Sequence, residues 1–249
     1  ITDLSSLYGA EVRPIHHSSS LQSILDSVGN IERVEPYAMR GCVIRSKSDA
    51  KGIVIKGESS FAHRATIADA IIDGSLPRME SQRYKELLLP ESVADKLGVG
   101  CGERVELIAL SEGSVPRPEL FKVCGIYRVM GDFPTEIALT DIRNVQKING
   151  WEDKTYSGFE IYTTEGTDNY TLSERINLYL FESYEGSENL SSVSAEQLYS
   201  NIFAWLETHD INATVIVVIM FIVALFNMVT ALLILLFERT RMVGILKSL

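Results

Sequence analysis

Residues 211–237 carry no charged side chain, and this run constrains the fold of the chain more than any other feature. It reads INATVIVVIMFIVALFNMVTALLILLF. As a helix rising about 1.5 Å per residue it spans roughly 40 Å, enough to cross the core of a bilayer with some tilt. A soluble protein would need a much larger chain to surround such a helix on every side. The run therefore predicts a membrane-spanning helix.

The charges beside the run predict its orientation. Acidic Glu207 and Asp210 precede it. The residues after it are basic on balance, with Arg239, Arg241 and Lys247 against Glu238. Because basic flanks stay in the cytoplasm, residues 1–210 are expected outside it. An export signal or an earlier membrane helix is then expected upstream of Ile1.

The charge balance of residues 1–210 narrows the choice of partners. The whole chain has 23 basic and 33 acidic residues, of which three and one lie after residue 210, so 20 and 32 precede it. This acidic part argues against nucleic acid or an anionic lipid surface as the main partner. Three cysteines, Cys42, Cys101 and Cys124, cannot form a complete disulfide framework. Either one bridge forms, with Cys101 and Cys124 the closer pair, or the thiols are free.

The first part of the chain, residues 1–75, is predicted to hold a helix, a hairpin and a second helix. Residues 18–29 begin with serines suited to a helix cap, place apolar side chains on one face and end at a glycine. Residues 33–45 and 52–56 are rich in Val and Ile and are separated by a polar turn, which indicates a hairpin. The second helix is expected near residues 61–72.

Residues 76–150 are predicted to form a small β-rich insert. Its expected elements are strands at 87–89, 104–110, 121–129 and 136–139, and helices at 91–97 and 140–148, the last capped by Thr140 or Asp141. The glycines of GVGCGERVELIAL do not match the nucleotide-binding pattern G-x-G-x-x-G and indicate a tight turn instead. Residues 111–118, SEGSVPRP, are a loop by composition.

Residues 151–210 are predicted to return to the first part and then lead to the membrane. A strand at 159–163 and a helix at 172–181 precede a polar link. Residues 194–209 are amphipathic. Their apolar face comprises Leu198, Ile202, Trp205 and Leu206. No proline or glycine separates them from the span, so we expect one continuous helix from about Ala195 to Phe237; a flexible break near residues 210–212 is the alternative.

Catalytic and metal-binding motifs do not stand out in this sequence. The histidines are adjacent on a strand or isolated, which suits zinc ligation poorly. The patterns G-x-S-x-G, H-E-x-x-H and G-x-x-x-x-G-K-[ST] do not occur, and the acidic residues are scattered. We therefore predict no catalytic residue, no metal site and no cofactor in this chain.

The segment after the span, FERTRMVGILKSL, is amphipathic. Met242, Ile245, Leu246 and Leu249 share one helical face. A basic cluster on anionic head groups explains the charges of this segment but not its apolar stripe, which fits a groove on another protein. Within the span, the polar groups of Asn227 and Thr230 face either a partner helix or substrate cavity, or the carbonyl groups of their own helix.

These segments resemble FtsX/MacB-type ABC transporter permeases. ERTRMVGILKSL, Glu238 to Leu249, is similar to the motif after the second membrane helix of that family, and FNMVTAL, Phe226 to Leu232, is most similar to the lipoprotein-releasing (LolC/LolE-type) branch. Further similar stretches are RVEP and VIKG around the predicted hairpin, LPESVADKLGV and GERV, and FKVCGIY.

The resemblance implies a fold and a set of partners. The fold is α+β, a MacB-like periplasmic core in which a discontinuous Porter part (residues 1–75 and 151–210) carries an inserted Sabre part (76–150). A transmembrane helix (211–237) and a cytoplasmic coupling helix (238–249) follow, in a bacterial inner membrane. The coupling helix would contact a separate ABC ATPase, which uses the ATP, through Glu238, Arg239, Thr240, Arg241, Met242, Gly244, Ile245, Leu246 and Lys247. A second permease subunit, identical or different, completes the assembly.

The resemblance leaves several functions open. The lipoprotein-releasing branch implies a lipoprotein substrate and a periplasmic carrier, although residues 111–118, where that branch carries its carrier-binding hook, are short. A MacB-like exporter of drugs or peptides would share the external architecture. Two alternatives belong to other functional classes. One is an FtsX-like signalling module that activates cell-wall hydrolases, and the other is a sensor domain with a single span.

Overall fold

The computed structural model describes residues 1–3, 13–16, 19–62, 65–109, 118–128, 136–183, 190–198 and 200–247. They form two compact units, Ile1–Val193 and Ser194–Leu249, each of which is described by itself. The first is a mixed unit of helices and strands, and the second is dominated by one long apolar helix. The predicted fold class, an α+β core followed by a membrane-type helix, is confirmed.

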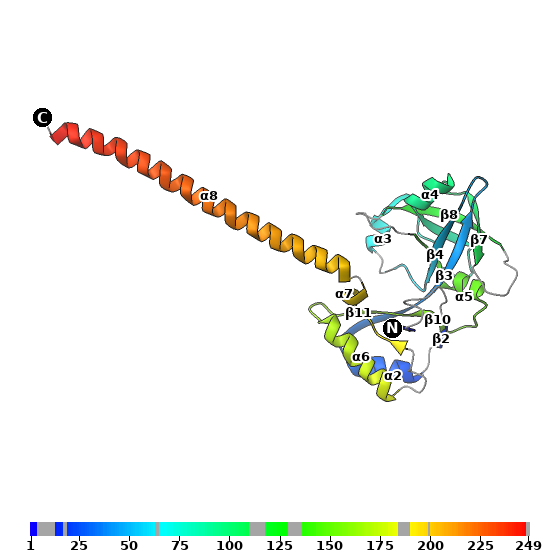
Figure 1. The fold of residues 1–249 in the computed structure, drawn as a ribbon. Coiled ribbons are helices and arrows are strands. Elements are labelled where there is room, and N and C mark those ends of the chain that lie inside the picture. Colours follow the sequence, from blue (N-terminus) through cyan, green and yellow to red (C-terminus); the bar gives the residue numbers. More distant parts are fainter. Residues whose placement is uncertain are drawn as a thin grey trace. The chain divides into compact units, whose positions relative to one another are not determined.

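Six strands of the first unit close into a barrel (Figure 1). Around the ring they are β3 (Ile31–Arg45), β4 (Ala50–Glu58), β9 (Ile137–Asp141), β6 (Glu86–Pro90), β8 (Glu119–Tyr127) and β7 (Arg104–Ala109), which pairs again with β3. The pairs β4–β9 and β6–β8 are parallel, and the other four are antiparallel. Ring closure leaves these strands without an open edge at the seam between β7 and β3.

The barrel interior is filled by apolar side chains. They come from alternate positions of the strands, as expected of a strand with one buried face, and include Ile44, Ile55, Leu89, Leu107 and Phe121. Two short helices, α4 (Glu91–Leu97) and α5 (Ile142–Asn149), add Val93, Leu97, Ile142 and Val145 to this core.

The caps of these two helices follow local sequence signals. Asp141 is the N-cap of α5, and its side chain accepts a hydrogen bond from the backbone N–H of Arg143. Gly98 and Gly150 end α4 and α5 in the left-handed conformation that glycine adopts at low cost.

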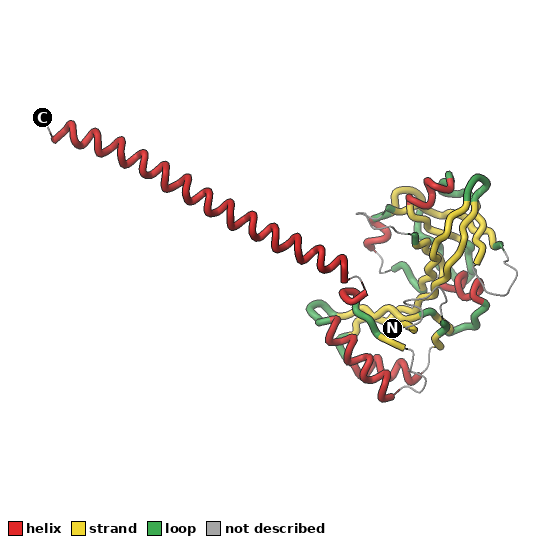
Figure 2. The backbone as a smooth tube through the Cα atoms, in the orientation of Figure 1, coloured by secondary structure: helices red, strands yellow, loops and turns green. Residues whose placement is uncertain are grey.

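A second layer lies beyond the barrel, on the first half of β3. There β3 pairs with β11 (Gly158–Thr163), and β1 (Thr2–Asp3) and β12 (Leu190–Ser191) extend the sheet. Helices α2 (Ser19–Val28) and α6 (Asn169–Ser183) lie side by side against one face (Figures 1 and 2). Leu21, Leu25, Phe159, Ile176 and Leu180 form the core between them. A separate two-stranded pair joins β2 (Ile15–His16) to β10 (Thr155–Tyr156).

Most of the predicted elements of this unit are confirmed, with small shifts at their ends. One is wrong: residues 61–72 do not form a single helix. Helix α3 covers only Ala65–Asp69, and β5 (Ile71–Gly74) follows as a strand antiparallel to β8. Adjacent β-branched Ile71 and Ile72 favour a strand, and Ile71 joins the apolar cluster of Phe61, Leu88 and Tyr127.

Strands of the predicted Porter and Sabre parts lie in the same barrel. The hairpin β3–β4 belongs to the first predicted part, whereas β6 to β9 belong to the predicted insert. The boundaries near residues 75 and 150 stay predictions. The predicted loop 111–118 lies, apart from Pro118, outside the described residues.

The second unit consists of α7 (Ala195–Leu198) and α8 (Ser200–Lys247). Ser194 and Gln197 form a reciprocal capping box at the start of α7, with hydrogen bonds of 3.2 Å and 2.9 Å. Tyr199, between the two helices, lies outside the described residues. Helix α8 runs through residues 210–212 without interruption, so the predicted continuity with the span is confirmed from Ser200 onward.

Candidate functional site

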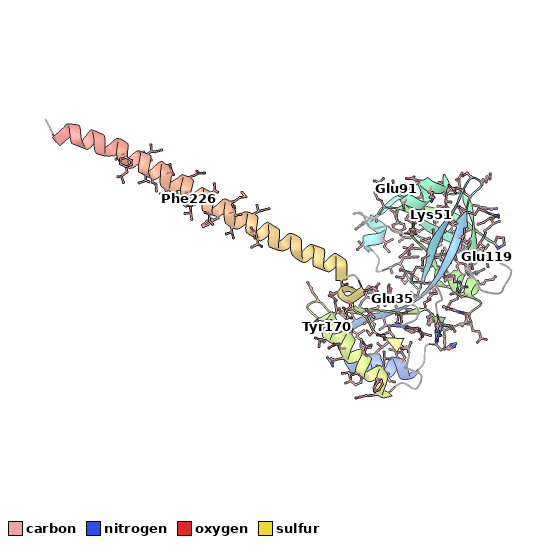
Figure 3. All side chains as sticks on the ribbon, viewed as in Figure 1. Glu35, Lys51, Glu91, Glu119, Tyr170 and Phe226 are labelled. Carbon is pink, nitrogen blue, oxygen red and sulfur yellow. The ribbon has the colours of Figure 1, made fainter. Side chains whose placement is uncertain are left out.

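Helix α8 contains one stretch that is long and apolar enough to cross a membrane. It comprises Ala213–Phe237, 25 residues with a mean hydropathy of 2.8, and none of its most apolar window is buried. Large side chains project outward along it, among them Phe226, which is labelled in Figure 3 and is 69% exposed. Exposure of so many apolar groups on one helix favours a lipid environment over water.

The two polar residues predicted as candidates within the span lie one turn apart on α8. The hydroxyl of Thr230 donates a 2.8 Å hydrogen bond to the backbone carbonyl of Phe226. Of the two alternatives for Thr230, the structure therefore has the bond to its own helix. Asn227 is exposed and lies three residues before Thr230, a spacing that places both on the same side of the helix.

The predicted ATPase-contact segment forms the last turns of α8. The backbone is helical through Lys247, so the segment continues the span directly. Arg239 is exposed. Ser248 and Leu249 lie outside the described residues, as do the side chains of Glu238, Thr240 and residues 241–247. A role for these residues in binding an ATPase stays a prediction.

A cluster of charges lies on the sheet of the first unit, on the face opposite α2 and α6. Glu35 of β3 is paired with Glu160 of β11, and Tyr37 with Glu58 of β4. Lys56 joins two of these carboxylates: its Nζ is 2.5 Å from Glu160 Oε1 and 3.2 Å from Glu58 Oε1. Figure 3 labels Glu35 in this region.

A second cation completes the cluster. Arg33 Nε is 2.7 Å from Glu35 Oε1, and the Arg33 guanidinium lies 4.1 Å from the centroid of the Tyr162 ring. The Tyr162 hydroxyl donates to Glu160 Oε2 at 3.2 Å. Each carboxylate thus faces a cation or a hydroxyl, and the arrangement joins β3, β4 and β11 instead of leaving a free acid–base group.

This cluster was not predicted from the sequence, because its acidic residues are far apart in the chain. A signal was present nevertheless. Arg33, Glu35 and Tyr37 alternate with apolar residues along β3, and Glu160 and Tyr162 do the same along β11. Such alternation places the charges on one face of a strand. The register that brings the strands together was not predictable from this pattern.

The helix-covered side of the same sheet has a shallow depression of about 320 Å³. Its lining residues are Gln22, Val34, Pro36, Lys154, Tyr156 and Phe159. The Tyr156 ring packs edge-on against Phe159 with centroids 5.5 Å apart. Burial raises the pKa of Tyr156, so its hydroxyl stays protonated at neutral pH. The depression offers an apolar floor and hydrogen-bonding groups but no poised acid or base.

The three cysteines are free thiols. Burial raises the pKa of Cys42 to about 12, and burial together with the nearby Glu86 raises that of Cys124 to about 12. Neither is therefore an activated nucleophile at neutral pH. Within the described ranges no three His, Cys, Asp or Glu side chains are placed to hold a metal ion. His16 Nδ1 lies 3.1 Å from the hydroxyl of Thr155.

Comparisons with known proteins found likenesses of fold only. No protein-family profile and no curated protein sequence matches this chain. Among solved structures, the extracellular domain of the noncanonic ABC-type transporter YknZ from Gram-positive bacteria is 12% identical, with a TM-score of 0.45, covering 76% of this chain and 91% of that one. The periplasmic region of MacB from Actinobacillus actinomycetemcomitans is also 12% identical, with a TM-score of 0.46, covering 78% of this chain and 84% of that one. A domain of a putative permease protein from Porphyromonas gingivalis is 12% identical, with a TM-score of 0.38, covering 66% of this chain and 69% of that one.

Proposed function

We propose that this chain is a permease-type subunit of an ABC transporter that transmits ATP-driven motion across the inner membrane to its external unit, for the release of lipoproteins. The observation that supports the proposal most is the continuity of α8. One helix of 48 residues contains both the apolar stretch and the segment that resembles the ATPase-contact motif.

An α-helix is stiff along its axis. Its backbone hydrogen bonds hold each turn to the next, so displacement at one end reaches the other end, whereas a loop would absorb it. At about 1.5 Å per residue, α8 extends roughly 72 Å. The residues from Glu238 onward lie beyond the apolar stretch. We propose that they extend into the cytoplasm, within reach of an ATPase subunit.

We assign separate tasks to this chain and to its partners. The sequence has no phosphate-binding loop, so ATP hydrolysis is assigned to a partner ATPase. A second permease subunit, identical or different, is assigned to the other half of the assembly. The net acidic external unit faces the periplasm, where a lipoprotein and its carrier are the proposed partners.

A proline within the apolar stretch tests the mechanical proposal. Val217→Pro removes a backbone N–H and kinks the helix, whereas Val217→Ala at the same exposed position leaves it straight. We expect the proline variant to insert in membranes and bind the ATPase but to lose ATP-dependent substrate release, and the alanine variant to retain it. If Val217→Pro retained full release, α8 would not act as a lever.

Affinity purification of the full-length protein from its native membrane in mild detergent tests the assignment of partners. Co-purification of an ABC ATPase with bound lipoproteins supports the proposal. An ATPase together with cell-wall hydrolases would favour a signalling module, and an adaptor with an exporter ATPase would favour drug or peptide export. Absence of any ATPase, with no effect of deleting residues 242–249, would contradict the coupling role itself.

A further inference from the structure

We infer that Cys101 and Cys124 are a modification site: a thiol pair that a small-molecule disulfide converts into an intramolecular disulfide. This bond would join the turn before β7 to β8 at one end of the barrel. This reaction is independent of the transport function, because it needs only the two thiols and an added disulfide. It can therefore be tested on the purified protein.

The backbone brings the two cysteines together. Cys101 lies in the turn between α4 and β7, and Cys124 lies within β8. The backbone N–H of Gly102 donates to the carbonyl of Val123 at 2.7 Å, and the N–H of Val123 donates to the carbonyl of Glu103 at 2.8 Å. Residues 102 and 103 therefore both oppose Val123, which is a β-bulge. Gly102 has a φ of 93°, as a glycine at this kind of bulge often does. The bulge places Cys101 beside Cys124.

The side chain of Cys101 confirms this proximity. Its Sγ is 3.2 Å from the carbonyl oxygen of Cys124. A cysteine sulfur is separated from the carbonyl of its own residue by two carbons only, so the two sulfurs belong to neighbouring groups. Closing the bond requires rotation of the side chains that brings the sulfurs to about 2.0 Å. Cys101 is exposed and reachable by a reagent, whereas Cys124 is buried.

A glycine on the neighbouring strand preserves the space around the sulfur. A Cβ placed on Gly74, at the end of β5, would lie 2.7 Å from Cys101 Sγ and 2.2 Å from the carbonyl oxygen of Cys124. Both distances are too short for a side chain at this position. The φ of Gly74, +80°, also favours glycine.

The third cysteine provides an internal control. Cys42 belongs to the apolar core inside the barrel and is 1% exposed. A reagent that enters only from solvent reaches Cys101 first and does not reach Cys42 in the folded protein.

The oxidation balances with glutathione disulfide as the oxidant. The Cys101 thiolate attacks one sulfur of glutathione disulfide, forming a mixed disulfide and releasing one glutathione. The Cys124 thiolate then attacks the Cys101 sulfur, forming the protein disulfide and releasing the second glutathione. The two cysteines lose two protons and two electrons, and the reagent is reduced to two thiols.

The burial of Cys124 sets the order and the rate of the steps. Its pKa of about 12 keeps it protonated at neutral pH, so it is the second thiol to react. Ring closure should therefore accelerate as the pH rises, by about tenfold per pH unit while the pH stays below the pKa of Cys124, because the thiolate fraction rises by this factor.

The test is oxidation of the full chain in detergent with glutathione disulfide, followed by denaturation, alkylation and mass spectrometry. We expect the number of alkylated cysteines to fall from three to one, Cys42 alone, with the loss of two hydrogen atoms and a cross-linked peptide pair containing Cys101 and Cys124. Cys124→Ser should stop at the glutathione adduct on Cys101, and Cys101→Ser should leave both remaining thiols reduced.

Two results would overturn the inference. One is a stable glutathione adduct on Cys101 in the unaltered chain, without ring closure at raised pH. The other is a dimer linked through Cys101. Since the unaltered protein supplies both readouts, poor folding of a serine variant does not prevent the test.

Discussion

The barrel and helix α8 contain the same apolar residue types, but these side chains are buried in the barrel and exposed on α8. In the barrel, Ile55, Leu89 and Phe121 face inward and are fully buried, so the chain itself keeps them from water. In α8, Val223, Phe226 and Phe237 are about half to two-thirds exposed, at 51%, 69% and 68%. In both elements the backbone groups form hydrogen bonds within the element, but only the barrel also provides an apolar environment for its own side chains. Helix α8 needs a lipid environment for the same purpose.

The largest expected difference comes from placing one carboxylate in each region. Ile55→Asp puts an unpaired charge in the barrel core and should cost more than about 4 kcal/mol, enough to leave the first unit protease-sensitive. Val223→Asp should leave that unit folded and cost about 2.5–3.5 kcal/mol of membrane insertion. Limited proteolysis and alkaline extraction of membranes measure the two effects. A protease-resistant Ile55→Asp variant would contradict the assignment of this core.

A matched pair of threonines should give a smaller difference. The Thr140 hydroxyl is buried, donates to the Glu86 carbonyl at 2.6 Å and accepts from Asn144 Nδ2 at 2.9 Å. Thr140→Val leaves both partners without this bond and should lower the free energy of unfolding by about 1–3 kcal/mol. Thr230→Val frees only a carbonyl already bonded within α8, so membrane insertion should change by less than about 1 kcal/mol. Urea unfolding measures the effect of Thr140→Val, and a membrane-insertion assay measures that of Thr230→Val. Equal free-energy changes in the two variants would contradict the expected difference between the buried and the helix-bonded hydroxyl.

The smallest expected effect is a pH dependence confined to the first unit. Burial of Glu86 opposes its ionisation, but hydrogen bonds from the Arg78 guanidinium at 2.9 Å and 2.6 Å, and from its backbone N–H, hold the pKa of Glu86 below its ordinary 4.5. The folded pKa is the lower one, so this stabilisation is present above pH 4.5 and is lost as the pH falls further.

The size of this effect is limited because the Arg78 side chain is 53% exposed; we expect about 1 kcal/mol or less. Urea midpoints measured at falling pH should show a slope that Glu86→Gln reduces. Residues 213–237 contain no ionisable side chain, so this apolar stretch of α8 should show no matching dependence. An unchanged slope in Glu86→Gln would assign the acid sensitivity to other carboxylates.

Elements with local signals were predictable from the sequence. Helix α4 has its predicted bounds, Asp141 caps α5 as one of two predicted candidates, and the predicted hairpin is the antiparallel pair β3–β4. Each depends on residues close together in the chain. The apolar stretch of α8 was equally clear, because its length and lack of charge need no partner to be recognised.

Closure of the barrel was not predictable, since no local pattern encodes it. Strand β4 lies parallel to β9, with Val54 opposite Ile137, and β6 lies parallel to β8. The charge cluster of Lys56, Glu58 and Glu160 depends on the same long-range register. The proximity of Cys101 to Cys124 depends in addition on a bulge at Gly102. The predicted roles of Glu238 to Lys247 depend on a partner protein and stay predictions.

The parallel pairing of β4 with β9 determines the order in which parts of the first unit can fold as the chain is synthesised. Strand β4 ends at Glu58, but its neighbour begins only at Ile137. Until that neighbour arrives, the hairpin has an exposed edge of unpaired N–H and C=O groups that other chains can join. Pairing across so large a separation is slow, because the intervening loop must close first. We therefore expect the nascent chain to be prone to aggregation until the residues up to Asp141 have been synthesised and β9 can pair.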